Sequence, residues 1–216
     1  MKITEIYQSI QGEGVHIGEP QIFVRLYGCN LRCRWCDTKF SIGTTSDDCK
    51  EMTVKQVFAE ISRSTCKAVC ITGGEPLVQK AELNDLLVIL RAFNYYVQIC
   101  TNGTLWEGEI FELCDFISMD MKAPSSGMES ELALIGWLES SRPKNSFEIK
   151  VVIQDTKDFI FAMDKVRPAF EGVLILQPEG GVKLRELTDL CLNLNIKNFR
   201  VLPQLHKLIW GLARKR

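Results

Sequence analysis

Short apolar segments rich in β-branched residues alternate along the chain with segments whose apolar residues recur every three or four positions. Apolar runs bounded by Gly, Asn or Pro are typical of buried strands, and leucines at helical spacing are typical of one helix face. The first pattern predicts strands at residues 21–27, 67–72, 95–101, 115–121, 147–153, 172–176 and 198–202.

The segments between these strands carry helix signals. Thr53 and Gln56 form a capping-box pattern ahead of apolar residues at helical spacing, which predicts the start of a helix. Residues 43–50 are polar and predict a loop, and residues 123–145 predict a loop with one helix. Further helices are predicted at residues 83–90, 156–167 and 183–194.

Strands that alternate with helices imply parallel pairing through right-handed crossovers. Six or seven such units are too few for a closed eight-stranded barrel. We therefore predict an α/β fold, a partial (βα)6-type barrel with a mostly parallel sheet, in which residues 1–216 form a single domain. Ligands of such folds bind at the carboxyl ends of the strands.

Composition narrows the class of protein. Hydrophobic residues make up 46% and charged residues 25% of the chain, as in ordinary globular proteins. With 26 Lys and Arg against 27 Asp and Glu, nothing argues for a nucleic-acid partner. No apolar run has the length of a membrane span, and no signal-peptide pattern opens the chain. The odd number of nine cysteines fits a reducing compartment, so we expect a cytoplasmic protein.

Three cysteines follow the first predicted strand at the spacing Cys29-x3-Cys33-x2-Cys36. Soft thiolates are the usual ligands of a four-iron cluster, and three of them leave one iron open for another ligand. Trp35 is placed to shield such a cluster or to stack on an adenine. A zinc knuckle is the alternative, but it requires a fourth Cys or His, and neither His16 nor His206 lies at such a spacing.

The cysteine spacing, with an aromatic residue before the last cysteine, resembles the signature of the radical S-adenosylmethionine (SAM) enzymes. In that superfamily SAM chelates the open iron and is cleaved to a 5'-deoxyadenosyl radical. Gly73-Gly74-Glu75-Pro76 follows the second predicted strand and resembles the superfamily motif that holds the amino group of SAM. Its glycines allow close backbone approach, and we expect its carbonyls and acid to be free to accept hydrogen bonds from an ammonium group.

A narrower resemblance covers nearly the whole chain. Ser9-Ile10-Gln11-Gly12-Glu13-Gly14, Phe23-Val24-Arg25 and Gly28-Cys29 resemble the 7-carboxy-7-deazaguanine synthases, and later blocks match in the same order. Those blocks are Cys36-Asp37-Thr38, Thr72-Gly73-Gly74-Glu75-Pro76, Thr101-Asn102-Gly103-Thr104, Lys122-Ala123-Pro124-Ser125-Ser126, Gln177-Pro178 and Pro203-Gln204-Leu205-His206.

The resemblance implies an activity. Enzymes of this family convert 6-carboxy-5,6,7,8-tetrahydropterin to 7-carboxy-7-deazaguanine by ring contraction with loss of ammonia, in queuosine and deazapurine biosynthesis. It implies a 4Fe-4S cluster, SAM and Mg2+ as cofactors, with the 5'-deoxyadenosyl radical, rather than a side chain, as the catalytic group. It also implies a flavodoxin-type electron donor and a homodimer.

Site residues follow from the matched positions. The resemblance implies that Cys29, Cys33 and Cys36 bind the cluster and that Thr38 binds Mg2+. It implies SAM contacts from Trp35, Cys36, Asp37, Gly74, Asp120, Met121, Lys122, Gln177, Pro178, Glu179 and Gly180. It implies substrate contacts from Ile10, Gln11, Gly12, Glu13, Arg25, Thr72, Gln204 and His206. A guanidinium such as that of Arg25 can donate two parallel hydrogen bonds to the substrate carboxylate.

The sequence departs from the pattern of the 7-carboxy-7-deazaguanine synthases at two places. Other members carry Ser-Pro-Lys where this chain has Asp120-Met121-Lys122. The chain also continues ten residues past His206, whereas some members place their C-terminal carboxylate in the substrate site.

The first alternative is a glycyl-radical activating enzyme, which would need no pterin pocket. Gln11 to Glu13 and Arg25 predict such a pocket and therefore argue against this alternative. A redox-sensing or zinc-stabilised binding module would leave the Gly73-Gly74-Glu75-Pro76 motif without a purpose.

Overall fold

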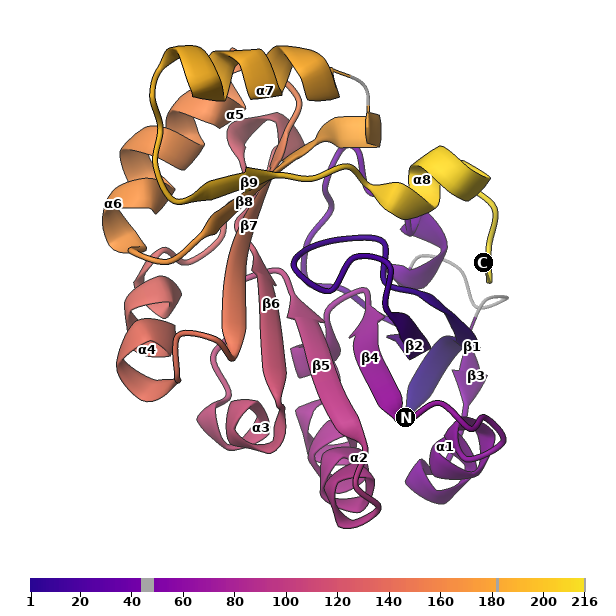
Figure 1. The fold of residues 1–216 in the computed structure, drawn as a ribbon. Helices are drawn as coiled ribbons and strands as arrows, with labels where there is room; N and C mark the ends of the chain where they lie inside the picture. The colour runs from indigo at the N-terminus through magenta and orange to yellow at the C-terminus, as the bar shows by residue number, and fades with distance from the viewer. Residues whose placement is uncertain (44–48, 182, 216) are drawn as a thin grey trace.

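One curved, open sheet organises the molecule, which is represented by a computed structural model that describes residues 1–43, 49–181 and 183–215. In these residues the strand order is β3-β1-β2-β4-β5-β6-β7-β8-β9; β1 pairs antiparallel with β2 and β3, and all later neighbours pair parallel (Figure 1). The strands are β1 Lys2–Ile10, β2 Pro20–Leu26, β3 Lys50–Glu51, β4 Ala68–Gly73, β5 Tyr96–Thr101, β6 Phe116–Asp120, β7 Phe147–Ile153, β8 Leu174–Pro178 and β9 Phe199–Val201.

Most helices connect the parallel strands and lie along the outside of the sheet, whereas the last helix follows the last strand (Figure 1). A π-helical turn, Ala162–Val166, joins α5 to α6. No helix of the described residues combines the length and the apolar character needed to cross a membrane. The helices are α1 Val54–Ile61, α2 Lys80–Ala92, α3 Gly108–Leu113, α4 Ala133–Ser141, α5 Thr156–Phe161, α6 Arg167–Ala169, α7 Leu184–Asn193 and α8 Leu205–Trp210.

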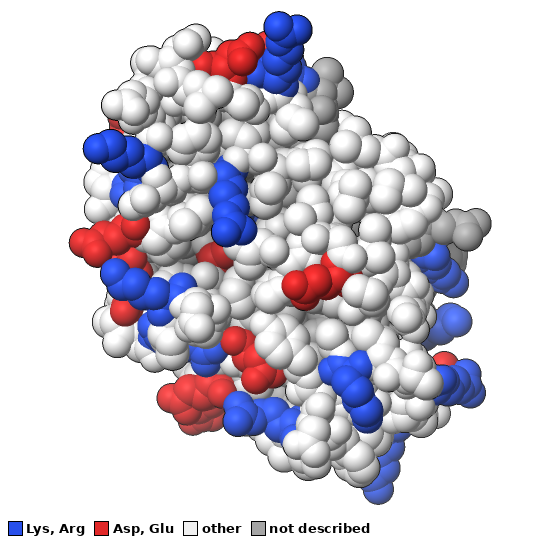
Figure 2. All heavy atoms as spheres, viewed as in Figure 1, with Lys and Arg blue, Asp and Glu red and all other residues white. Residues whose placement is uncertain are grey.

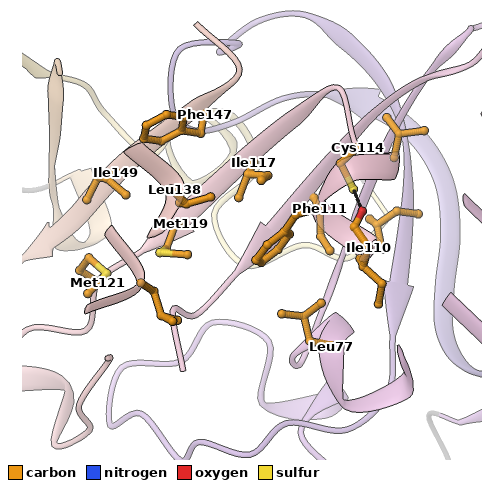
Figure 3. Packing of buried hydrophobic residues seen from close by; sticks show 14 of the residues in the cluster. Leu77, Ile110, Phe111, Cys114, Ile117, Met119, Met121, Leu138, Phe147 and Ile149 are labelled. Carbon is orange, nitrogen blue, oxygen red and sulfur yellow. Dashed lines mark hydrogen bonds between the residues drawn. The ribbon is translucent and has the colours of Figure 1, made fainter. Parts of the chain in front are cut away.

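Side chains of the parallel strands alternate between a polar and an apolar face, as the two-residue period of a strand requires. In β7, Ile149 and Val151 are fully buried in the hydrophobic cluster, while Glu148 and Lys150 face the other way. The apolar face packs against the helices, and Ile117 and Ile149 of the sheet belong to the same buried cluster as Phe111 of a helix (Figure 3). The polar face is therefore the concave one, on which a ligand site can form.

The predicted α/β fold with a mostly parallel, open sheet is confirmed. All seven predicted strands and the predicted helices are present, and the capping box forms: Gln56 N–H donates to Thr53 Oγ1 at 3.2 Å, and Thr53 N–H donates to Gln56 Oε1 at 2.8 Å. Residues 44–48 of the predicted loop 43–50 lie outside the described residues. Strand β1 was not predicted, because polar residues such as Thr4 and Glu5, both buried here, interrupt its apolar pattern.

Candidate active site

A cavity of about 250 Å³ opens at the carboxyl ends of the parallel strands, on the concave face of the sheet. Its walls come from β1, β2, β4 to β7, the cysteine loop and the C-terminal segment. Most residues implied by the family resemblance are brought together here. They are Ile10, Gln11, Gly12, Glu13, Arg25, Cys33, Trp35, Cys36, Asp37, Thr38, Thr72, Gly74, Asp120, Lys122, Gln204 and His206.

The cysteine loop offers three free thiols. Cys33 and Cys36 line the cavity, and the Cys29 sulfur accepts hydrogen bonds from Leu31 N–H at 3.4 Å and from Asn102 Nδ2 at 3.9 Å. Burial raises the pKa of the Cys29 and Cys33 thiols. Three thiols in one loop, one of them already bonded by a backbone N–H, are a donor set that suits an iron-sulfur cluster.

A mononuclear metal site is not preformed in the described parts of the chain. No group of three or more His, Cys, Asp or Glu side chains there is gathered closely enough to hold one metal ion. A tetrahedral zinc ion with Zn–S bonds of about 2.3 Å would require such a group.

The turn after β4 packs directly onto the cysteine loop, and its glycine makes this possible. A Cβ atom added to Gly74 would lie 2.0 Å from the carbonyl oxygen of Gly28 and 2.9 Å from Cys29 Cβ. Gly74 N–H donates to Leu26 O at 3.0 Å, and Glu75 N–H donates to Gly28 O at 2.8 Å. Any larger residue at position 74 would push the two backbones apart, so the glycine fixes the loop against the sheet.

The expectation that the acid of this motif is free is wrong. Glu75 is fully buried, and its carboxylate accepts hydrogen bonds from Leu77 N–H at 3.1 Å, Thr101 Oγ1 at 3.0 Å and Asn102 N–H at 2.8 Å. Burial raises the pKa of Glu75 despite these bonds. Glu75 does not line the cavity; it ties the turn after β4 to the end of β5.

Trp35, Asp120 and Lys122 form one polar corner beside the cysteine loop. Lys122 Nζ lies 2.8 Å from Asp120 Oδ2 and 5.6 Å from the centre of the Trp35 ring, while Trp35 Nε1 donates to Ser125 Oγ at 3.0 Å. Burial lowers the pKa of Lys122, but the charge and the hydrogen bond of Asp120, together with the nearby Cys33, outweigh this effect and the pKa is raised. Asp120 Oδ1 is buried without a hydrogen-bond partner, so this corner can accept a donor from a ligand.

Five of the residues implied to bind SAM do not line the cavity. The side chain of Met121 is fully buried in the hydrophobic cluster (Figure 3), so only its backbone remains available to a ligand. Gln204 and Lys207 connect the end of β8 to the site: Gly180 N–H donates to Gln204 Oε1 at 2.9 Å, and Lys207 Nζ lies 3.5 Å from Glu179. The five residues are Met121, Gln177, Pro178, Glu179 and Gly180.

Glu13 meets a buried cation on β7, the strand next to that of Asp120. The ammonium of Lys150, from β7, contacts Glu13 Oε2, and Gln204 Nε2 donates to Glu13 Oε1 at 2.7 Å. Burial alone would raise the pKa of Glu13, but Lys150, His206 and Gln204 together lower it well below its usual range. Burial likewise opposes the charge of Lys150, yet Glu13 and Asp120 raise its pKa well above the usual value. The pair is therefore ionised at neutral pH.

The N-terminal loop and the C-terminal helix meet at Gly12. Leu205 N–H donates to Gly12 O at 2.9 Å, and a Cβ atom added to Gly12 would lie 2.3 Å from His206 Nδ1. His206 Nε2 in turn lies 3.5 Å from Asp37 Oδ2. Segments almost two hundred residues apart thus close one end of the cavity, as the adjacent loop after β1 and helix α8 in Figure 1 indicate.

Gln11 is held by a chain of buried amides. Its Nε2 donates to Gln21 Oε1 at 3.2 Å, and Gln21 Nε2 donates to Gln98 Oε1 at 3.1 Å. The Gln11 oxygen accepts from Glu13 N–H at 3.2 Å. These bonds fix the orientation of the Gln11 amide, so its nitrogen and its oxygen have defined positions in the cavity wall.

Arg25 extends from β2 beside Thr72 of β4, its partner in the parallel register. Its Nη2 donates to the Tyr7 hydroxyl at 3.1 Å, and its Nε lies 3.5 Å from Glu5 Oε2 without a hydrogen-bond partner. Burial lowers the pKa of Arg25, but Tyr7 and Glu5 outweigh this effect and raise it. Thr38 lines the same cavity, and its Oγ1 lies 3.6 Å from Cys36 Sγ without capping the turn that follows.

Several cavity residues were missed from the sequence. Lys150 had a signal, because it alternates with apolar residues in β7, but the segment was interpreted only as an apolar strand. Glu5 and Tyr7 belong to the unpredicted strand β1. Phe40 and residues 210–215 carry no motif, and only the fold brings them to the cavity.

Comparisons with known proteins place these residues in context. Residues 23–126 match the Radical SAM superfamily model. The chain is 38% identical to 7-carboxy-7-deazaguanine synthase from Thermoplasma acidophilum, over 98% of both chains, and 32% identical to 7-carboxy-7-deazaguanine synthase from Aquifex aeolicus, over 95% of this chain and 91% of the relative.

Two solved structures are similar to this chain in their fold. The crystal structure of QueE from Escherichia coli superimposes with a TM-score of 0.72 at 27% identity, covering 95% of this chain and 94% of that one. Streptococcus suis SuiB bound to S-adenosylmethionine shares the fold with a TM-score of 0.55 at 16% identity, covering 84% of this chain and 46% of that one.

Proposed function

The chain belongs to the 7-carboxy-7-deazaguanine synthase family of radical SAM enzymes, and from this membership we propose how the residues of its cavity divide the work of the reaction. The enzyme is a lyase that uses a 4Fe-4S cluster, SAM and Mg2+. The cluster and SAM, when bound, supply the 5'-deoxyadenosyl radical that starts the conversion of 6-carboxy-5,6,7,8-tetrahydropterin to 7-carboxy-7-deazaguanine with loss of ammonia. The protein's own residues bind, orient and shield the reactants.

Cys29, Cys33 and Cys36 hold the cluster in this proposal. The free state of all three thiols and the N–H donated by Leu31 to Cys29 support it. Gly74 keeps the loop against the end of β4, since its missing side chain allows the close backbone contact described above. A fixed loop holds the thiols at the mouth of the cavity, where the cluster can meet a ligand bound inside.

The corner formed by Trp35, Asp120 and Lys122 binds SAM, together with Asp37 and the backbone of Gly74. The unpartnered oxygen of Asp120 supports a role as acceptor for an ammonium or hydroxyl group. The Trp35 ring provides an apolar face beside the cluster loop. The other residues implied by the family, Met121 and Gln177 to Gly180, contribute through backbone atoms or by supporting Gln204 and Lys207.

The pterin substrate lies between the N-terminal loop and β2. Arg25 binds the substrate carboxylate, and the buried Arg25 Nε without a hydrogen-bond partner, in the same cavity as Cys33 and Cys36, is the observation that carries this assignment. Gln11 and Glu13 bind the pterin edge with help from Ile10, Gly12 and Thr72, while Gln204 and His206 close the pocket. Glu13 can accept two donors because Lys150 keeps it ionised.

Thr38 contributes one hydroxyl to Mg2+. A single protein oxygen satisfies the octahedral ion only when substrate oxygens and water complete its coordination. The absence of a capping bond from the Thr38 side chain to the following turn supports this role. The metal site therefore forms with the substrate bound.

The proposal also covers the partners of the protein and its location in the cell. We take residues 1–216 as one radical SAM domain that is reduced by a flavodoxin-type donor in the cytoplasm, a compartment supported by nine free thiols. A homodimer is supported by the exposed apolar side chains of Leu208, Ile209 and Leu212 around α8. We propose neither a nucleic-acid nor a membrane partner; on the face shown in Figure 2, charges of both signs are interspersed.

Arg25 provides the test. Arg25→Ala should retain the cluster and SAM cleavage but lose affinity for 6-carboxytetrahydropterin, because the substrate carboxylate then lacks its cation. Arg25→Lys, which keeps the charge next to Glu5, controls for damage to the fold, and Arg63→Ala, at a side chain 76% exposed, is a neutral control. Pterin affinity in Arg25→Ala equal to that of the wild type would refute the role.

A further inference from the structure

Asp158 is a fully buried acid on α5 that does not line the cavity. Its carboxyl group accepts hydrogen bonds from Ser125 N–H at 2.9 Å, from the Ser125 hydroxyl at 2.5 Å and from Gln154 N–H at 2.8 Å. One oxygen thus binds the backbone of Ser125, and the other binds its side chain. Two contacts to the same residue fix both the position of Ser125 and the direction of its hydroxyl.

Ser125 connects this acid to the wall of the cavity. Its hydroxyl has one proton, which it donates to Asp158, so the oxygen keeps lone pairs for another donor. Trp35 Nε1 is that donor, at 3.0 Å from Ser125 Oγ. A directed chain of hydrogen bonds therefore runs from Trp35 through Ser125 to Asp158. Of these three residues, only Trp35 lines the cavity.

The indole N–H is the only polar group of the Trp35 side chain, so its hydrogen bond decides how the ring is oriented. The ring is half-buried, and Lys122 Nζ lies 5.6 Å from its centre. A cation at this distance is attracted by the whole face of the ring, whereas a hydrogen bond to Nε1 selects one rotamer. Without that bond the ring could adopt other rotamers and leave its place in the wall.

The backbone of the cysteine loop is attached to the same segment independently of the Ser125 hydroxyl. Arg34 N–H donates to Ser126 O at 2.9 Å, and Arg32 N–H donates to Met128 Sδ at 3.4 Å. Removal of the hydroxyl would therefore release the indole ring but leave the loop in place. The orientation of the ring and the position of the loop can thus be separated by experiment.

We infer that Ser125 and Asp158 are positioning residues for SAM, because they hold the Trp35 ring in the orientation that binds the cofactor. The inference rests on the proposed function, which places Trp35 in the SAM site. A binding side chain keeps its geometry when hydrogen-bonded neighbours fix its rotamer. The Lys122-Ala123-Pro124-Ser125-Ser126 block thereby contributes to the SAM site through Ser125 as well as through Lys122.

The test is a double-mutant cycle in which anaerobic calorimetry measures SAM binding to the reconstituted holoenzyme. Ser125→Ala should weaken binding about 3- to 10-fold, as expected for the loss of one hydrogen bond that orders a binding residue. Trp35→Phe keeps an aromatic ring but removes Nε1, and it should weaken binding at least as much. Adding Ser125→Ala to Trp35→Phe should cause no further loss, because the hydroxyl acts only through that N–H.

Two further variants separate positioning from folding. Ser125→Thr keeps a hydroxyl and should restore most of the SAM affinity lost in Ser125→Ala. Asp158→Asn should also weaken SAM binding, because its amide nitrogen cannot accept one of the three donors. Iron content per chain, and affinity for 7-carboxy-7-deazaguanine at saturating SAM, should stay at wild-type values in Ser125→Ala. Ser140→Ala, at an exposed serine of α4, is the matched control.

Unchanged SAM binding in Ser125→Ala would overturn the inference, and so would an equal additional loss when this substitution is made in Trp35→Phe. A Ser125→Ala enzyme that loses iron together with SAM affinity would show that the residue only holds the loop, and would overturn it as well. Trp35→Ala distinguishes these failures from failure of the proposed function. If Trp35→Ala weakens SAM binding while Trp35→Phe and Ser125→Ala do not, the proposed SAM site stands and the inference fails. If Trp35→Ala binds SAM as the wild type does, the proposed role of Trp35 fails and the inference fails with it.

Discussion

The loop after β1 and the turn after β4 each bury one glutamate, and the two carboxylates are stabilised in different ways. Glu13 contacts the ammonium of Lys150, whereas the hydrogen-bond donors to Glu75 are all neutral. Burial raises the pKa of both groups, but at Glu13 the effects of Lys150, His206 and Gln204 together outweigh it. The pKa of Glu13 is therefore lowered and that of Glu75 raised.

The difference separates a ligand-facing acid from a structural one. Glu13 stays ionised and lines the cavity, so it can bind a pterin donor. Glu75 is closed off within the turn that holds the cysteine loop. The role of a glutamate therefore cannot be inferred from its sequence motif alone. It depends on the charge of the residues that contact the carboxylate and on whether the carboxylate faces the cavity.

Among variants at these two glutamate sites, Lys150→Met is expected to change the free energy of unfolding most. It leaves the carboxylate of Glu13 buried beside an apolar chain, which should lower the free energy of unfolding by about 3–5 kcal/mol. Urea unfolding monitored by circular dichroism measures it. Lys144→Met, at a side chain 75% exposed, is the control. The double variant Glu13→Gln with Lys150→Met should recover part of the loss, and a single variant as stable as the wild type would contradict the pairing.

A smaller effect is expected from Glu75→Gln. The amide keeps one acceptor but presents a donor to a site that offers only donors, so the free energy of unfolding should fall by about 1–3 kcal/mol. Because Glu75 lies outside the cavity, KM for the pterin should stay close to the wild-type value in the fraction that folds. A selective rise in KM, with normal stability, would mean that Glu75 contacts a ligand after all.

The smallest expected effect concerns the pH dependence of stability, which should have opposite signs for Glu13 and Glu75. The lowered pKa of Glu13 means that its stabilisation is present above the unfolded-state value of 4.5 and is lost as the pH falls below it. The raised pKa of Glu75 means that the folded protein gains stability as the pH falls through that pKa. Each unit of pKa difference corresponds to about 1.4 kcal/mol.

Unfolding free energies of the wild type, Glu13→Gln and Glu75→Gln, measured from pH 7 to pH 4, test this. The advantage of the wild type over Glu13→Gln should shrink as the pH falls, and its advantage over Glu75→Gln should grow. Slopes of the same sign for both variants would contradict the contrast.

The parallel strands could be predicted because their apolar face has to pack against helices, which leaves a periodic signal in the sequence. β7 shows both the success and the limit: Ile149 and Val151 identify a strand, but the interpretation overlooked that Lys150 between them faces a cavity. Strand β1 was missed because its buried residues include Thr4 and Glu5, whose burial depends on partners elsewhere in the chain.

Residues that line the cavity could be singled out from the sequence where chemistry fixes their spacing in the chain. Cys33 and Cys36, chosen for their spacing, line the cavity, and so does Arg25, which the resemblance to a known family added; their roles stay predictions. The contact of Arg214 with Glu5 joins residues 209 positions apart, so no local pattern announces it. Glu75 was misjudged because its surroundings, not its motif, determine whether its oxygens are free.

The central claim is that this cavity carries out the ring contraction of the family. The most direct test is an anaerobic assay of the reconstituted protein with SAM, dithionite, Mg2+ and 6-carboxy-5,6,7,8-tetrahydropterin, followed by mass spectrometry. We predict that 7-carboxy-7-deazaguanine forms only when SAM is present and that SAM is not consumed in proportion. A protein that takes up a cluster and cleaves SAM slowly, yet leaves the pterin unconverted, would contradict the claim.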